Sequence, residues 1–379
     1  MFGVDEQVGL WEPSCASTCI AYAECGGSPY APCGCVFAGS DRQGLCHECH
    51  VSCRERSGPT GNESAAFYRD GLSLGELSLV GKAVSMPPFV PLRTSELSHT
   101  ISAAFVAAGF RDLFRRTDGE SIRVSPHLDS AASLRRRLRV RENARVLVVL
   151  NGHDDKLESF WGSDRPALYE TLRRASVSLV TGPTFSISGE SGALPPYHNA
   201  TMDRRQNRVL QELNDAGMTA VPNIYWRNDA ARRNWADHIR SSSVSIISRD
   251  FSRTKAVTAF DEHINGLAHL VESVGRPLHV IVLGVGIRKA TYAMSQLRKA
   301  GATSSFVASE PIMQAIKRGA ALEHNERRLT AVRRIDVSTA ALALANLNAF
   351  QEHLLRQVDG SVRAEPPIRY IGGRISNVA

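Results

Sequence analysis

The stretch His279–Ser309, HVIVLGVGIRKATYAMSQLRKAGATSSFVAS, contains two short apolar runs with an amphipathic segment between them. The segment ends at Gly301, as a helix with a glycine C-cap does. A strand that is apolar along nearly its whole length is buried on both faces, which is typical of a parallel sheet covered by helices. The stretch therefore predicts a strand, a helix and a second strand of a parallel sheet.

The same alternation fills residues 86–356. The expected strands are PPFVPL (87–92), ARVLVVLN (144–151), SVSLVTG (176–182), TAVPNIYW (219–226), SVSIISRD (243–250), HVIVLGVG (279–286), TSSFVAS (303–309) and, as the weakest pattern, LTAVRRID (329–336). Eight strand–helix units over about 270 residues match a (βα)8 barrel, which typically takes about 250 residues. The sequence predicts this TIM-like barrel, and an open doubly wound sheet is the alternative.

All eight cysteines of the 379 residues lie near the amino terminus, among several glycines and prolines. The segment that holds the cysteines contains too few aliphatic residues to form a core, whereas a bound metal supplies folding free energy directly. The uneven spacing favours iron–sulfur ligation, as [4Fe-4S] clusters, over zinc, and disulfides in an exported protein are a further alternative. The expected metal ligands are Cys15, Cys19, Cys25, Cys33, Cys35, Cys46, Cys49 and Cys53.

These patterns divide the chain into four expected parts. Residues 1–56 form a cysteine-rich metal-binding domain, 57–85 a glycine-rich linker, 86–356 the barrel and 357–379 a basic tail. The first residues show no signal peptide, and no apolar run approaches the roughly 20 residues that a membrane helix needs. We therefore expect a soluble, cytoplasmic protein.

The charge of the chain is uneven. The formal net charge is +7, and the run LRRRLRVREN (134–143) is its densest basic segment. A basic surface attracts polyanions, so we expect DNA or RNA as a partner; a merely solvated helix face is the alternative. The expected phosphate contacts are Arg135, Arg136, Arg137 and Arg139.

In a barrel, catalytic residues lie where strands end. The polar residues at or just after the ends of the expected strands include Asp154 and Asp250, which we expect to act as acid and base. Helix capping by NGHDDK (151–156) and an ion pair between Arg249 and Asp250 are the structural alternatives. The expected substrate-binding residues offer a ring for stacking, a cation and space beside a ligand: they are His153, Asn223, Trp226, Arg249, Gly284 and Gly286.

One region of the chain combines a Pro-x-Phe-Ser element, an arginine-rich helix and a Val-x-Pro-Asn-x-x-Trp element. Over roughly 100 residues it resembles an uncharacterised domain family of bacterial, plasmid and phage proteins. No activity follows from it. The matching residues are Pro183, Phe185, Ser186, Arg204, Arg205, Arg208, Val221, Pro222, Asn223 and Trp226.

A second region, residues 277–306, is similar to the late barrel segment of tRNA-guanine transglycosylases and their DNA-modifying relatives. There, a strand ending in Gly-Val-Gly precedes a helix and a strand that carries Phe-Asp. This chain has Val307 and Ala308 after Phe306 in place of the aspartate, and its cysteines are N-terminal rather than C-terminal. The resemblance implies a barrel fold and a nucleic-acid substrate class.

Three classes of function follow from these patterns. The first is an enzyme that modifies or exchanges a base of nucleic acid or of a nucleotide, with carboxylates at the barrel mouth. The second is a nucleic-acid-binding module without catalysis. The third is an iron–sulfur redox protein.

Overall fold

The computed structural model describes residues 20–21, 24, 66, 68–94, 97, 99–116, 122–125, 128–185, 187, 196–254, 256–325, 328–357 and 366–371. The chain divides into two compact units, each of which is described by itself. The first consists of Met1–Leu77, Phe185–Arg208 and Trp226–Asn228, and the second of Ser78–Thr184, Val209–Tyr225 and Asp229–Ala379.

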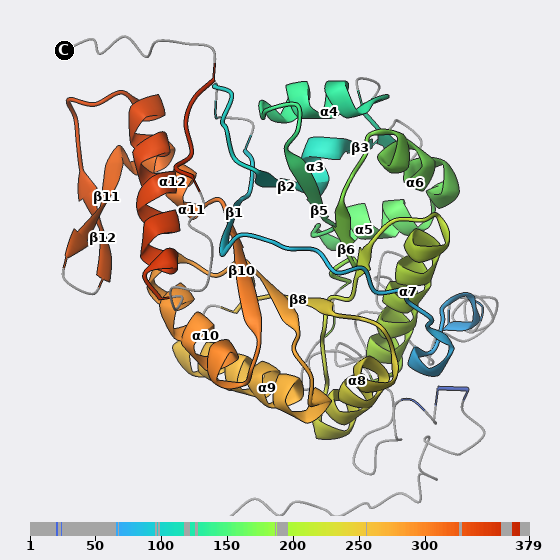
Figure 1. Ribbon diagram of the computed structural model, residues 1–379. Coiled ribbons are helices and arrows are strands. Elements are labelled where there is room, and N and C mark those ends of the chain that lie inside the picture. The colour runs from blue at the N-terminus through green and yellow to red at the C-terminus, as the bar shows by residue number, and fades with distance from the viewer. Residues whose placement is uncertain are drawn as a thin grey trace, which may run out of the picture. The chain divides into compact units, whose positions relative to one another are not determined.

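The second unit contains two four-stranded sheets (Figure 1). One has the order β1-β10-β9-β8, with the bounds Phe89–Pro91, Thr303–Ala308, His279–Leu283 and Ile246–Asp250. The other has the order β2-β5-β6-β7, with the bounds Phe105–Gly109, Arg145–Val149, Leu179–Thr181 and Ala220–Val221. Every pair within these sheets is parallel. The predicted mixed α/β class with parallel sheets is therefore confirmed.

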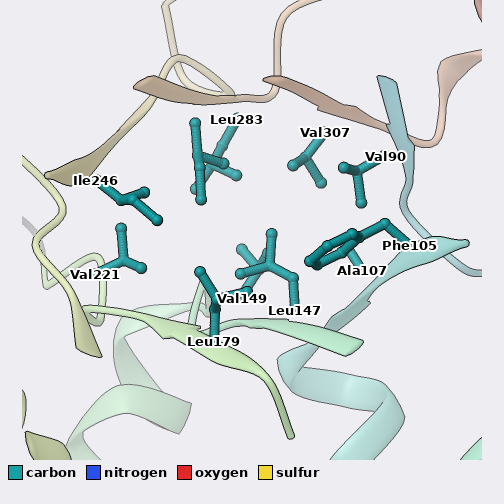
Figure 2. Close-up of a cluster of buried hydrophobic side chains, with 11 residues drawn as sticks. Val90, Phe105, Ala107, Leu147, Val149, Leu179, Val221, Ile246, Leu283 and Val307 are labelled. Carbon is teal, nitrogen blue, oxygen red and sulfur yellow. The ribbon is translucent and has the colours of Figure 1, made fainter. Parts of the chain in front are cut away.

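The edges of the two sheets are linked by parallel bridges. Leu92, directly after β1, bridges to Ala107 of β2, and Asn223, after β7, bridges to Ser248 of β8. Figure 2 shows the buried cluster that lies among the strands. Each of the eight strands contributes to it, through Val90, Phe105, Ala107, Leu147, Val149, Leu179, Val221, Ile246, Ile281, Leu283 and Val307.

Helices follow most of the strands. The bounds are α3 Phe110–Leu113, α4 Ala131–Leu138, α5 Asp154–Trp161, α6 Arg165–Arg174, α7 Pro196–Asp215, α8 Asp229–Ser241, α9 Val257–Val274, α10 Ile287–Lys299, α11 Glu310–Arg318 and α12 Thr339–Leu355. Figure 1 shows α9 and α10 running beside β8 and β10. Local chemistry sets their ends: α9 stops at Gly275, which has φ +71°, and the Ser338 hydroxyl caps α12 by accepting from the Ala341 N–H.

One expected strand has a different partner. The segment LTAVRRID forms β12 (Arg328–Arg333), which pairs antiparallel with β11 (Ala320–Asn325) outside the parallel sheets. Its assignment as the eighth strand of the parallel array was wrong, because most of its residues are exposed and a parallel strand is covered on both faces. The remaining parallel strand is β2, which the sequence analysis missed. A second hairpin pairs β3 (Phe114–Arg116) with β4 (Ile122–Val124).

The described part of the first unit has its own small core. Tyr68 stacks on Tyr197 with ring centroids 5.7 Å apart, and the Arg204 guanidinium donates to the Tyr68 carbonyl at 2.9 Å and to the Glu24 carboxylate at 2.5 Å. All eight cysteines lie outside the described residues, so the predicted metal-binding domain stays a prediction.

Candidate active site

A cavity of about 510 Å³ in the second unit lies at the carboxyl ends of β1, β2 and β5. Residues that follow β8 and β10 complete its lining. Binding sites of parallel α/β folds are built at this end of the strands, so we take this cavity as the candidate active site. Its ionisable lining residues are Arg93, Arg111, Asp112, His153, Lys156 and Arg253.

Asp250, the last residue of β8, is held beside this cavity by two residues that line it. The Asn151 side-chain amide donates to Asp250 Oδ2 at 2.5 Å. The Ser252 N–H donates to Asp250 Oδ1 at 2.8 Å, and the Ser252 hydroxyl donates to Oδ2 at 3.0 Å. Burial raises the pKa of the Asp250 carboxyl above its ordinary value, although the hydrogen bonds from Ser252 oppose this shift. The carboxyl is thus fixed in place, with its pKa shifted towards neutral from that of a free aspartate.

Arg249 precedes Asp250 on the strand and faces the other way, because successive side chains of a strand alternate between its two faces. Its guanidinium is buried and donates to the Ile224 carbonyl at 3.0 Å. It also lies over the Tyr225 ring, with 5.3 Å between the guanidinium carbon and the ring centroid. Burial lowers the pKa of Arg249 to about 10, so it remains a cation at neutral pH. These contacts give Arg249 a structural position.

The other predicted residues of this region are spread over different environments. His153 lies at the N-cap position of α5 and lines the cavity. Asp154 is the first residue of α5 and is exposed, whereas its neighbours Gly152 and Lys156 line the cavity. Asn223 is fully buried at the bridge between β7 and β8. Trp226 belongs to the first unit and is half-buried.

Gly284 and Gly286 lie along a second cavity of about 240 Å³. Gly284 has φ +70°, and a Cβ atom there would lie 2.6 Å from the Ser252 backbone. A Cβ at Gly286 would lie 2.5 Å from the Glu310 carboxylate, which accepts a hydrogen bond from the Ile287 N–H. Gly284 therefore requires glycine for the close approach of backbone, whereas the atom nearest Gly286 is the end of the flexible Glu310 side chain.

The arginine run lies on α4 and just beyond it, and its members differ. Arg135 is 7% exposed and donates to the carbonyls of Ala144, Ala175 and Ser176 at 3.2, 2.6 and 3.0 Å. It therefore holds main chain together and presents no surface to a polyanion. Arg139 is exposed, caps the helix with φ +52° and donates to a carbonyl. Arg136 and Arg137 are exposed, so both remain candidates for the expected phosphate contacts.

Several lining residues were missed by the sequence analysis. Arg93 and Thr94 are the first polar residues after the expected strand PPFVPL, so the strand-end rule that pointed to Asp250 applies to them equally. Arg111 follows β2, and because that strand was missed, no signal pointed to it.

Fold and cavity together define a mixed α/β protein with a largely cationic cavity at the carboxyl ends of parallel strands. No protein-family model matches the chain, and the comparison with curated proteins gives no match. The two resemblances therefore rest on the sequence motifs alone.

In the part of the chain that the structure describes, no group of three or more His, Cys, Asp and Glu side chains is placed to hold a metal ion. Within the same residues, none of the helices combines the length and the apolarity needed to cross a membrane.

Proposed function

We propose that the eight parallel strands form a closed (βα)8 barrel. The pairs within the two sheets and the two bridges between their edges together join each strand to its neighbour in chain order. The shared apolar cluster has the composition of a filled barrel interior, with Val, Ile and Leu dominant. In such a barrel all strand ends surround one mouth.

We further propose that the protein is an enzyme acting on nucleic acid or a nucleotide, with Asp250 as its acid–base group. The observation that carries this proposal is the Asp250 carboxyl itself, fixed by Asn151 and Ser252 beside the cavity and with its pKa raised by burial. A carboxyl with a raised pKa exchanges protons closer to neutral pH.

The cavity supports an anionic substrate. Its lining includes the cations Arg93, Arg111, Lys156 and Arg253 and one carboxylate, that of Asp112. Such an imbalance raises the local concentration of anions. Base modification or exchange is the reaction class that we propose for this site. The N-terminal cysteines, as ligands of iron–sulfur clusters or zinc, belong to the same proposal, but no step depends on them.

Replacing Asp250 by asparagine is expected to lower turnover at least about 100-fold, the usual contribution of an acid–base group. The full chain is incubated with RNA, DNA and mononucleotides. Released bases and altered nucleosides are then separated by chromatography and identified by mass spectrometry. Asp336→Asn is the control, because Asp336 is exposed and lies outside the cavity lining. An Asp250→Asn variant as fast as wild type contradicts the assigned role, and a wild type that changes none of these substrates contradicts the enzyme.

A non-catalytic nucleic-acid-binding module is the second candidate, because Arg136 and Arg137 are exposed side by side. Each phosphate that a side chain neutralises contributes about −0.9 to the slope of log affinity against log salt on duplex DNA. Arg136→Gln/Arg137→Gln should therefore flatten this slope by up to about 2. The measurement is fluorescence anisotropy with labelled duplex DNA at several salt concentrations.

The matched control for this experiment is Arg173→Gln/Arg174→Gln, a pair that is equally exposed on α6 and bound to Glu170. Its slope should equal that of wild type. Arg135 is left intact in both variants, because its loss would uncouple three backbone carbonyls. If Arg136→Gln/Arg137→Gln retains the wild-type slope, or duplex DNA does not bind at all, the two arginines are only a solvated helix face.

A further inference from the structure

Arg93 is a buried cation in the cavity with unused hydrogen-bonding capacity. It is 5% exposed and lines the cavity. Its Nη2 donates to the Leu97 carbonyl at 3.1 Å, but among the described residues neither Nε nor Nη1 has a hydrogen-bond partner. Burial lowers the pKa of Arg93 to about 10, with Arg139 adding to the effect and Asp112 opposing it, so the guanidinium stays charged at neutral pH. A buried charge with idle N–H groups is unfavourable unless something else supplies acceptors.

Two further polar atoms at the same cavity share this property. Thr94 Oγ1 and Asn151 Oδ1 are buried, and within the described part of the chain neither forms a hydrogen bond. The Arg93 guanidinium offers one N–H at Nε and two at Nη1, and the Thr94 hydroxyl offers a further donor. Asn151 Oδ1 offers an acceptor, while its amide nitrogen is already bound to Asp250. These lining residues thus hold several unused donors and one unused acceptor.

The chemistry of these atoms selects among anions. A carboxylate uses the two N–H groups of one arginine fork and has no hydroxyl with which to reach Asn151 Oδ1. A phosphate has three or more oxygens in a tetrahedral arrangement, so it reaches donors in several directions, and its doubly negative form suits the additional cations Arg111, Lys156 and Arg253. A sugar hydroxyl next to the phosphate of a nucleotide, or the P–OH of free hydrogenphosphate, would donate to Asn151 Oδ1.

We propose that this cavity binds a free or terminal phosphate group, with Arg93 and Thr94 as its donors. The four cations of the lining favour the double negative charge of a terminal phosphate over the single charge of a phosphodiester inside a chain. This inference rests on the proposed function in taking a nucleotide as the carrier of the phosphate. It narrows the substrate to a 5′- or 3′-phosphorylated nucleotide or a phosphorylated strand end.

Calorimetric titration of the full chain tests the phosphate site, with inorganic phosphate, 5′-AMP and adenosine as probes. We expect 5′-AMP and phosphate to bind and adenosine to bind at least tenfold more weakly than 5′-AMP. A 5′-phosphorylated oligonucleotide should compete with 5′-AMP, and the same oligonucleotide without the phosphate should not. Equal affinity for 5′-AMP and adenosine, or for the two oligonucleotides, overturns the proposal.

Variants assign the site to its residues. Arg93→Met is expected to weaken 5′-AMP at least tenfold, whereas Arg123→Met, an exposed arginine outside the cavity, should leave the affinity unchanged. If Arg93→Met does not fold, Thr94→Val and Lys156→Met each remove one donor and should each weaken 5′-AMP severalfold. Unchanged affinity in the folded variants places the phosphate elsewhere and overturns the proposal.

A final comparison separates this inference from the proposed enzyme. Asp250→Asn should retain 5′-AMP binding, because the carboxylate is not a phosphate ligand. Turnover that depends on Asp250 without any phosphate binding would leave the enzyme in place and refute the phosphate site. Phosphate binding that depends on Arg93, without any turnover, would support the phosphate site and refute the proposed enzyme.

Discussion

Replacing Asn346 by alanine is expected to lower the free energy of unfolding by about 4 kcal/mol. Asn346 lies on α12 and is fully buried. Its Oδ1 accepts from the Leu322 N–H at 2.6 Å, and its Nδ2 donates to the carbonyls of Pro311 and Ala320 at 3.0 and 2.9 Å. Alanine leaves the Leu322 N–H and the Ala320 carbonyl buried without partners, at about 1–3 kcal/mol each, and also removes the bond to the Pro311 carbonyl.

Urea titration of wild type and variant measures this loss. Asn265→Ala is the matched control, because Asn265 is exposed on α9 and its replacement should stay within about 0.5 kcal/mol. A loss below about 1 kcal/mol for Asn346→Ala would mean that water satisfies these groups and that Asn346 does not join α12 to β11 and α11.

The second large effect is a loss of stability in acid that depends on His279. This residue begins β9, and its ring nitrogens lie 2.8 Å from Thr303 Oγ1 and 2.9 Å from Ser305 Oγ. Burial lowers the pKa of His279 to about 4 in the folded protein, whereas an unfolded histidine has a pKa of about 6.5. Between these pH values the unfolded chain binds a proton that the folded chain does not, so stability falls as the pH drops from about 6.5 to 4. The loss from this one residue amounts to about 3 kcal/mol.

The measurement is urea unfolding at pH 7, 6, 5 and 4 for wild type and for His279→Gln, which keeps a hydrogen-bonding side chain. Burial also lowers the pKa values of His238, His263 and His353, so these residues contribute to the loss of stability in both proteins. The difference between the two curves therefore reports the contribution of His279 alone. His269→Gln, at an exposed position, should follow wild type. If His279→Gln loses stability in acid as steeply as wild type, the His279 imidazole is hydrated and its assigned pKa is wrong.

The strands show where pattern reasoning succeeded and failed. Seven parallel strands were predicted because continuous apolar runs such as ARVLVVLN leave few other structures open. The strand β2 was missed because most residues of FVAAG are alanine or glycine, which favour no strand by themselves. LTAVRRID was placed in the parallel array although its polar residues suit a strand with an exposed face, which is what β12 is.

The candidate site divides in the same way. Asp250 and Asn151 follow predicted strands, so the strand-end rule pointed to both positions. Arg249 was grouped with Asp250 although strand alternation alone places the two on opposite faces. Arg135 was grouped with Arg136 and Arg137, but consecutive residues of a helix point about 100° apart, and only the fold decides which arginine is buried.

The sequence by itself determined the mixed α/β class, the parallel sheets and most strand and helix positions, because burial on both faces of a strand and the capping of a helix depend on adjacent residues. The tertiary structure decided which strand ends surround one cavity. Arg93 and Ser252 line the same cavity although they lie far apart in the chain, and no pattern near either residue contains information about the other. Side-chain burial was likewise decided by the fold, since the environment of Arg93, Arg135 or His279 depends on elements that are distant in sequence.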